Sequence, residues 1–267
     1  MGKGRGWTWA LWIVAAAVFV FLMAPILAVI PLSFNDSTFL TYPMTGFSLK
    51  WYREFFTSDH WLNASWNSAV IGVASTVLAT GLGTLAALGL NEARFPAKRL
   101  VVGLLVSPMI VPAVIAAVGL YFFFAPLGLT GSYHGIILSH TMLATPFVVI
   151  TVSATLQGFD MTLVRAAASL GAAPAAVFFR VVLPLILPGV ASGALLAFAT
   201  SLDEVVMILF LAGAEQRTLP REMFSGIREN ISPTILAVAT MLTLLSVFLL
   251  ATLEVLRRRN ERLRGAG

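Results

Sequence analysis

Six long apolar runs constrain the fold of this chain more than any other feature. Their approximate bounds are Trp9–Leu32, Asn67–Leu90, Leu100–Phe124, His134–Leu156, Leu185–Gly213 and Pro233–Leu256. Each is close to the roughly 20 residues that a helix needs to cross a bilayer. Because lipid offers no partner to backbone polar groups, runs of this length satisfy those groups internally as helices. We therefore predict an all-α, polytopic membrane protein with six transmembrane helices.

The composition agrees with this class. Hydrophobic residues make up 58% of the chain and charged residues only 11%, whereas a soluble domain carries about 25% charged residues. The mean hydropathy is +0.91 and the pI is about 10.1. A high pI can indicate a nucleic-acid partner, but here the basic residues cluster in short loops between apolar runs, as in membrane proteins. We expect the lipid bilayer, and no nucleic acid, as the partner of these charges.

The distribution of Lys and Arg predicts the orientation of the chain. The more basic set of loops and ends holds Lys3, Arg5, Arg94, Lys98, Arg99, Arg165, Arg180, Arg257, Arg258, Arg259, Arg262 and Arg264. The opposite set holds Lys50, Arg53, Arg217, Arg221 and Arg228. The positive-inside rule places the more basic set in the cytoplasm. Both termini, and the segment between the fourth and fifth runs, are therefore expected to be cytoplasmic.

We expect one domain, residues 1–267, with three parts. A first helix and its external loop occupy 1–66, a core bundle occupies 67–256, and a basic cytoplasmic tail occupies 257–267. Within the external loop, the segment Phe47–Phe56 predicts a short amphipathic helix on the membrane surface. Packing over the outer mouth of the bundle is the favoured role of that helix, and docking of a partner is the alternative.

The fifth run holds two adjacent acids, Asp203 and Glu204, in otherwise apolar sequence. A carboxylate at the centre of a membrane helix costs roughly 2.5–3.5 kcal/mol on insertion scales, so such residues face a bundle interior or water. Adjacent helical positions point about 100° apart. The candidate residues of a polar path are therefore Asp203, Glu204, Thr200 and Met207. We choose Asp203, which shares a face with Met207, to face the path, and Glu204, near the Thr200 hydroxyl, to face protein; the exchanged assignment of the two acids stays open. An acid that caps or pairs inside the bundle remains the alternative for either residue.

Two further patterns in the apolar runs predict packing. Gly189, Gly193, Ala197 and Ser201 recur at every fourth position, which is typical of helices that approach closely in lipid. His134 and His140 lie near the start of the fourth run. We interpret a histidine there as a hydrogen-bonded packing residue more readily than as a ligand.

The segment between the fourth and fifth runs reads LVRAAASLGAAPAAVFFRVVLPLILPG over Leu163–Gly189. It predicts a helix over Leu163–Leu170, a turn at Gly171, and a second helix over Pro174–Val182, followed by Leu183-Pro184. Glycine accepts the positive φ that ends a helix, and proline is tolerated in a first helical turn.

This segment resembles the EAA coupling loop of bacterial ABC-importer permeases. That motif reads Glu-Ala-Ala, three residues, Gly, nine residues, an aliphatic residue, one residue and Leu-Pro. The matching residues are Ala166, Ala167, Gly171, Val181, Leu183 and Pro184, and Arg165 stands where the motif has Glu. The resemblance implies that Arg165, Ala166, Ala167, Gly171, Phe178, Phe179, Leu183 and Pro184 contact an ATPase subunit.

Most of the chain is similar to type I importer permeases, and within them to the spermidine/putrescine permease branch. The residues that carry this similarity are Phe47–Tyr52, Asn67-Ser68, Ser201–Val206, Leu219-Pro220 and Ile231–Pro233. It implies a multi-pass permease of the bacterial inner membrane that works by alternating access. The implied partners are an ATPase dimer, a second homologous permease (most simply as a heterodimer) and a periplasmic solute-binding protein.

The implied substrate is a polyamine or a similar small cationic amine. Another amine, an amino-phosphonate or ferric iron are alternatives within the same class, and an ion-coupled secondary transporter is an alternative outside it. The sequence has no G-x-x-x-x-G-K-[ST] motif, so ATP hydrolysis is expected on a separate chain. It also shows no metal-ligating cluster or cofactor loop. We expect a transport subunit with no cofactor and no bound metal, and not an enzyme.

Overall fold

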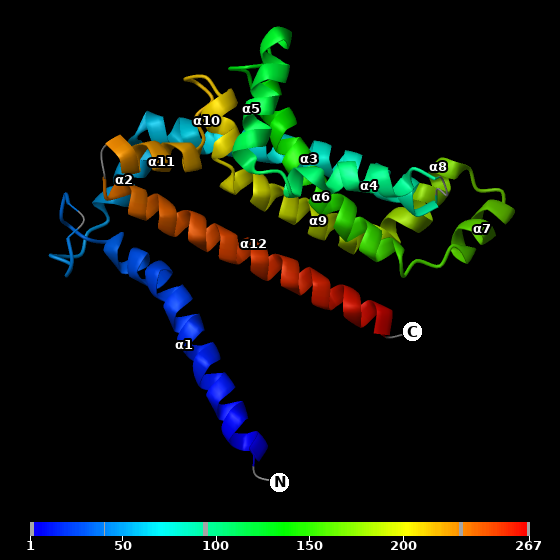
Figure 1. Cartoon of the computed structure of the whole chain (residues 1–267), viewed down its shortest axis with the longest axis horizontal. Helices are drawn as coiled ribbons and strands as arrows, with labels where there is room; N and C mark the ends of the chain where they lie inside the picture. The colour runs from blue at the N-terminus through cyan, green and yellow to red at the C-terminus, as the bar shows by residue number, and fades with distance from the viewer. Residues whose placement is uncertain (1–2, 40, 93–95, 230–231, 266–267) are drawn as a thin grey trace. The chain divides into compact units, whose positions relative to one another are not determined.

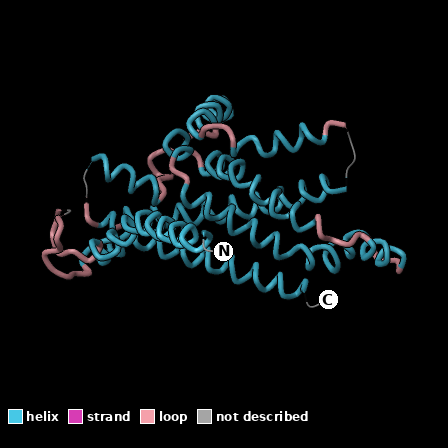
Figure 2. The backbone as a smooth tube through the Cα atoms, turned by 60° about the horizontal axis from the view of Figure 1, so that its bottom comes forward, coloured by secondary structure: helices cyan, strands magenta, loops and turns pink. Residues whose placement is uncertain are grey.

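The computed structural model describes residues 3–39, 41–92, 96–229 and 232–265. Helices make up most of this backbone (Figure 2). Within the described ranges, β pairing is limited to an isolated bridge between Asn35 and Phe47. The chain divides into two compact units, residues 1–62 with 223–245, and residues 63–222 with 246–267. The expectation of one permease domain with a core over 67–256 stays a prediction.

Among the described residues, five helices are long and apolar enough to cross a membrane. They are contained in α1 (Lys3–Leu32), α3 (Asp59–Glu92), α6 (Tyr133–Leu156), the segment ending with α9 (Leu183–Asp203), and α12 (Thr234–Gly265) (Figure 1). The all-α class and the polytopic character are thereby confirmed. A sixth span exists if the bent pair described next is counted as one.

The third predicted span is not a continuous helix. It consists of α4 (Lys98–Val106), the short 3-10 helix η1 (Ser107–Met109) and α5 (Ala113–Phe124), with a bend of 104° between its two halves. Pro108 and Pro112 are the cause, because each lacks an N–H and crowds the preceding turn. The sequence placed both prolines inside one predicted run, Leu100–Phe124, and in the structure that run is divided into two helices.

In the first unit, α2 (Lys50–Thr57) anchors the loop that follows α1. Trp51 is buried, and its indole N–H donates to the carbonyl of Asn35 over 2.7 Å. The hydroxyls of Ser33 and Tyr52 lie 2.7 Å apart. The predicted amphipathic helix over Phe47–Phe56 therefore exists, beginning at Lys50, and its aromatic face holds its own loop in place.

In the second unit, α3, α6 and α9 supply most of two buried clusters. One cluster comprises Ala79, Ala87, Ala144, Val148, Val152, Leu156, Ile186 and Ala197. The other adds residues of α5 and of α10 (Val206–Leu211), and comprises Ile71, Ala117, Phe124, Ile136, Met207, Ile208 and Leu211. Helices α6 and α9 lie side by side within this unit (Figure 1).

Two buried glycines set the distance between α6 and α9. A Cβ built on Gly193 would lie 2.6 Å from the Thr151 hydroxyl oxygen and 3.0 Å from the Cα of Val148. One built on Gly189 would clash with the Thr155 hydroxyl and lie 2.8 Å from the Cβ of Thr155. The predicted row Gly189, Gly193, Ala197 and Ser201 is buried along its whole length. Small side chains let the two backbones approach closely, as helix packing in lipid requires.

We expect Gly193→Ala to lower the melting temperature of the purified protein. The added methyl group must displace the Val148 backbone, and overpacking of this kind costs about 1–3 kcal/mol. Gly81→Ala is the matched control on α3, because a Cβ there meets nothing within 4 Å. Equal melting temperatures for the two variants would contradict the close-approach argument.

Candidate functional site

The loop between α6 and α9 folds as a short helix, a tight turn and a second helix. Asp160 lies two residues before α7 (Thr162–Ser169), and its carboxylate accepts hydrogen bonds from the Thr162 backbone N–H at 2.9 Å and hydroxyl at 2.7 Å. The hydrogen bond from the Thr162 hydroxyl is the largest cause that lowers the pKa of the Asp160 carboxyl below its ordinary value, and the bond from the Thr162 backbone N–H is the next. Asp160 therefore stays ionised and stabilises the start of α7.

Gly171 makes the turn after α7, as predicted. Its φ is +83°, in the region that favours glycine. The Gly171 N–H donates to the Ala168 carbonyl at 2.9 Å, and the Ala172 N–H donates to the Ala167 carbonyl at 3.1 Å. This pair of bonds is a Schellman motif, which satisfies carbonyls that the helix end leaves free. A Cβ at Gly171 would meet nothing within 4 Å, so its conformation alone requires glycine.

The second helix runs into α9 without a break. It comprises α8 (Pro174–Val177) and the π-helical turn η3 (Phe178–Val182), in which the Leu183 N–H bonds to the Phe178 carbonyl. Pro184 has no N–H to give to the preceding turn, and a π turn absorbs that missing bond while the helix continues. We expected the second helix to end at Val182, whereas in the structure the helix continues through Leu183 and Pro184 into α9.

The side chains expected to couple to an ATPase fall on two sides of this loop. Arg165, Ala166 and Phe179 are exposed, whereas Ala167 and Phe178 are partly buried. Phe178 lines a cavity of about 390 Å³ with Leu88 and Asn91 of α3, Leu156 of α6, and Val164 and Ala168 of α7. The loop thus has an inner face on that cavity and an outer face open for contact.

Sequence reasoning did not include Leu170 in the predicted site. This side chain is 88% exposed at the end of α7, directly before the Gly171 turn, and Phe179 is 63% exposed. An apolar residue next to the turn glycine was the signal that could have identified it. Together, Leu170 and Phe179 give the outer face a hydrophobic character.

The fifth predicted span is interrupted at the two acids. Helix α9 ends at Asp203, Glu204 is extended with φ −77° and ψ 120°, and α10 begins at Val206. The Glu204 carboxylate accepts a hydrogen bond from the Met207 backbone N–H at 2.9 Å. Glu204 therefore caps the start of α10, a position where the helix dipole favours an anion.

This geometry corrects the predicted surroundings of Glu204. The Thr200 hydroxyl donates to the Leu196 carbonyl at 2.9 Å and does not hold Glu204. The 100° argument assumed a continuous helix through both acids, whereas Glu204 lies outside α9. Met207 also differs from expectation, because its side chain is fully buried in the core cluster and not open to a path.

Asp203 is exposed at the last position of α9. Among the residues that the structure describes, its carboxylate has no hydrogen-bond or ion-pair partner. The two acids therefore differ in environment, since one is held by a backbone N–H and the other is free.

Ser75, His140 and Ser201 form a buried cluster of hydrogen-bonded polar side chains, and Ser201 lies two residues before Asp203 in the sequence. The Ser201 hydroxyl is 2.7 Å from the Nδ1 atom of His140 and accepts a hydrogen bond from the Ser75 hydroxyl at 3.0 Å. This cluster links α3, α6 and α9. The interpretation of His140 as a hydrogen-bonded packing residue agrees with its place in this cluster.

The loop after α10 is hydrogen-bonded to residues near the start of the second unit. The Asn67 amide donates to the carbonyls of Glu215 at 2.7 Å and Arg217 at 2.9 Å, and Asn67 accepts from the Tyr133 hydroxyl at 2.7 Å. The Leu219 N–H, at the start of α11 (Leu219–Glu229), donates to the Ser68 hydroxyl at 2.8 Å. The position of α10 is therefore set at both ends.

Comparison with known proteins decides the family. The profile of the "binding-protein-dependent transport system inner membrane component" family matches residues 79–262. The chain belongs to this family. It is 34% identical over 244 residues to the spermidine/putrescine transport system permease protein PotC of Haemophilus influenzae, covering 91% of this chain and 95% of that one. It is 35% identical to the putrescine transport system permease protein PotI of Escherichia coli K12, over 84% and 82% of the two chains.

The fold of this permease is also similar to a solved structure. A bacterial ABC transporter involved in the import of the acidic polysaccharide alginate aligns with a TM-score of 0.70 and 16% identity, covering 97% of this chain and 96% of that one. The chain is thus a multi-pass inner-membrane permease of an ABC importer, and not an enzyme. The ion-coupled secondary transporter kept as an alternative was the wrong class.

In this permease, we expect Glu204→Ala to destabilise α10 and lower the melting temperature of the purified protein. Loss of a helix-capping acceptor costs about 0.5–2 kcal/mol. Glu204→Gln keeps a carbonyl oxygen that can accept from the Met207 N–H, so it should melt close to the parent protein. If both variants melt equally low, the charge of Glu204, and not its hydrogen bond, is what matters.

Proposed function

We propose that this permease forms one half of the translocation path of a polyamine importer. Spermidine, putrescine or a similar small cationic amine is the substrate class. Two relatives that carry polyamines in their names, at 34% and 35% identity, support this. The proposed assembly contains a second homologous permease, an ATPase dimer and a periplasmic solute-binding protein. In this assembly the coupling loop and both termini face the cytoplasm.

The environment of Asp203 is the observation that carries the substrate class. Asp203 ends α9, where the last carbonyls of a helix lack intrahelical partners and the dipole is negative. An exposed carboxylate at that position therefore creates a site for a cation. Glu204 does not compete for the cation, because its carboxylate caps the N-terminus of α10, where the helix dipole is positive. Membrane carriers use broken helices in this way, with cations at half-helix C-termini.

The same environment argues against the alternative substrates. An amino-phosphonate would bring its anionic group towards Asp203 and the negative end of α9. Ferric iron favours several hard oxygen ligands, and the described residues contain no group of three or more His, Cys, Asp or Glu that could hold a metal. One carboxylate attracts an ammonium group yet releases it, which transit requires.

The loop supplies the proposed link to ATP hydrolysis. Arg165, Ala166, Leu170 and Phe179 lie on its exposed side, where a groove on an ATPase subunit can receive them. Since η3 continues into α9, movement of the docked loop moves α9. The cation site at Asp203 then changes its accessibility between the two sides of the membrane.

We expect Asp203→Asn to raise the apparent KM for spermidine by about 10–100-fold in reconstituted vesicles supplied with ATP and no ion gradient. A hydrogen bond to a charged group contributes about 1.5–3 kcal/mol, and 1.4 kcal/mol corresponds to tenfold. Glu215→Gln is the control, because it removes an exposed acid elsewhere on the chain. Unchanged kinetics in Asp203→Asn at matched abundance would overturn the path assignment.

We expect Gly171→Leu to abolish uptake and uncouple ATP hydrolysis while the protein remains in the membrane. A leucine strains the backbone at φ +83° and so reorients the loop. Gly171→Asn is the control, because asparagine tolerates this region better than other non-glycine residues. Uptake and ATPase activity, measured together, should therefore be affected less by Asn than by Leu. Normal uptake in Gly171→Leu would contradict the proposed role of the loop in coupling transport to ATP hydrolysis.

A further inference from the structure

The buried cluster of Ser75, His140 and Ser201 contains an atom that the fold leaves unsatisfied. His140 is 1% exposed, and its Nδ1 atom lies 2.7 Å from the Ser201 hydroxyl. Its Nε2 atom is buried and has no hydrogen-bond partner among the described residues. In a neutral imidazole one ring nitrogen is a donor and the other an acceptor, so Nε2 stays unpaired in either tautomer. His140 therefore takes part in the cluster through Nδ1.

The unpaired nitrogen shows that bulk is not what distinguishes histidine at position 140. A buried polar atom without a partner destabilises a fold, and an apolar side chain such as leucine would fill the space without that cost. The feature that leucine lacks is the contact between Nδ1 and Ser201. Because hydrogen bonds are directional, this contact can fix the rotation of α9 in a way that apolar packing cannot.

The register between α6 and α9 places this contact at the end of their packed row. A Cβ on Gly193 of α9 would lie 3.0 Å from the Cα of Val148 of α6. Two steps of four residues, forwards along α9 and backwards along α6, lead from this pair to Ser201 and His140. The intermediate step meets one buried alanine on each helix. The hydrogen bond is therefore the polar end of an otherwise small and apolar row, next to the point where α9 ends at Asp203.

Ser201 and Asp203 lie on opposite sides of the last turn of α9. Successive residues of an α-helix point about 100° apart, so two residues at positions i and i+2 point about 200° apart. Ser201 is buried and Asp203 is exposed, which agrees with this geometry. Since the helix stops at Asp203, no further turn helps to hold it. A rotation of the last turn would move both side chains together, so a bond that fixes Ser201 also fixes the direction of the carboxylate.

We propose that His140 is a positioning residue, which sets the direction of the Asp203 carboxylate through Ser201. The Ser75 hydroxyl donates to Ser201 at 3.0 Å, so the proton of Ser201 is free to bond with Nδ1. The role in positioning follows from the geometry of the cluster. Its consequence for transport rests on the proposed function, in which Asp203 attracts the polyamine.

The first test is the reactivity of a cysteine at position 203. The chain has no cysteine of its own, so Asp203→Cys can be labelled with a cationic methanethiosulfonate in the purified, assembled transporter and read on this chain by mass spectrometry. An Asn amide can take the place of Nδ1, whereas a Gln amide lies at the place of Nε2. We expect His140→Gln to change the labelling rate about 2–10-fold, the equivalent of one neutral hydrogen bond, and His140→Asn to leave it near the parental rate.

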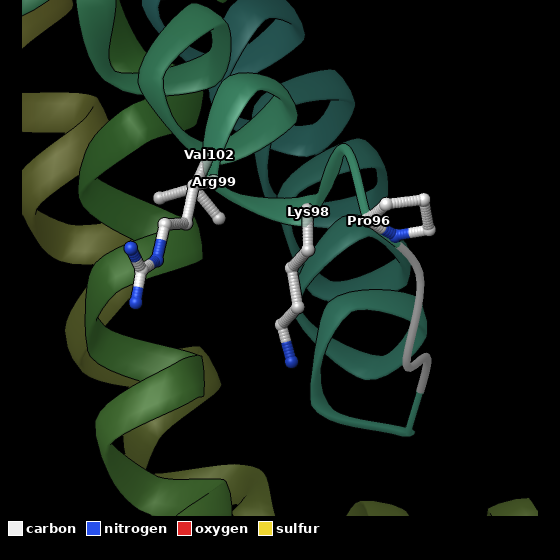
Figure 3. A pocket seen from close by; sticks show the side chains of 4 residues that line it. All are labelled: Pro96, Lys98, Arg99 and Val102. Carbon is white, nitrogen blue, oxygen red and sulfur yellow. The ribbon is translucent and has the colours of Figure 1, made fainter.

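Two controls separate this effect from a general change in the protein. His134→Gln is the matched substitution, because His134 is an exposed histidine of the same helix. Arg99→Cys is the reference site, because Arg99 is exposed and lines a cavity of about 590 Å³ at the start of α4 (Figure 3). Labelling at position 99 should not depend on the residue at position 140.

The second test is the kinetics of spermidine uptake in reconstituted vesicles supplied with ATP. We expect His140→Gln to raise KM about 2–10-fold with a smaller change in kcat, and His140→Asn to keep the parental KM. In the Asp203→Asn background, His140→Gln should add nothing to KM, because the carboxylate that His140 positions is absent. A merely structural defect would lower abundance or kcat in both backgrounds alike.

Three outcomes would overturn the proposal. Equal labelling at position 203 in His140→Gln and His134→Gln would show that the end of α9 does not depend on His140. Parental behaviour of His140→Gln with loss in His140→Asn would make Nε2, and not Nδ1, the important atom. An effect of His140→Gln on KM that persists in Asp203→Asn would show that His140 acts by another route. By contrast, the expected labelling together with a parental KM in Asp203→Asn would support the positioning role and overturn the proposed function.

Discussion

The structure depends on one constraint, which is that backbone polar groups in lipid must find partners within the protein. Most of the chain meets it with uninterrupted helices, and threonine hydroxyls donate back to carbonyls four residues earlier, as at Thr145, Thr200 and Thr240. Two of the interruptions in the described helices show how the constraint is otherwise met. At Pro184 a π turn shifts the bonding register and keeps the helix intact. At Glu204 a carboxylate replaces the missing carbonyl partner of α10.

The cap at Glu204 also explains why two adjacent acids can have different roles. A helix that stops in an apolar run creates a negative end and a positive end close together. Glu204 neutralises the positive end by bonding to the Met207 N–H. Asp203 lies at the negative end, where its own charge adds to that of the free carbonyls. The break therefore separates a structural carboxylate from the one that we propose serves a cation.

The sequence predicted what depends on composition and local turn chemistry, and it failed where a single residue redirects the backbone. Apolar runs, the Gly171 turn, and the buried row from Gly189 to Ser201 were predictable because each rule concerns near neighbours in sequence. The break at Glu204 was not predictable, because the sequence Leu-Asp-Glu-Val is compatible with a continuous helix. Only the structure shows that the Met207 N–H donates to the Glu204 carboxylate. Likewise, some prolines break a predicted span and others lie within an unbroken helix. Pro108 and Pro112 produce a 104° bend, whereas Pro146 lies within the unbroken α6.

The proposed coupling between the loop and Asp203 depends on how α9 is held. The 21 residues of α9 span about 30 Å at 1.5 Å per residue, from the π turn at the coupling loop to Asp203. Along that length, Gly189 and Gly193 leave no space between α9 and α6, and Ser201 is bonded to both His140 and Ser75. The face of α9 that packs on α6 has no gap at which the helix could bend, so bending there cannot absorb a displacement of the loop. In the proposed mechanism, helices α6 and α9 therefore move together, and motion of the loop reaches the carboxylate at the far end.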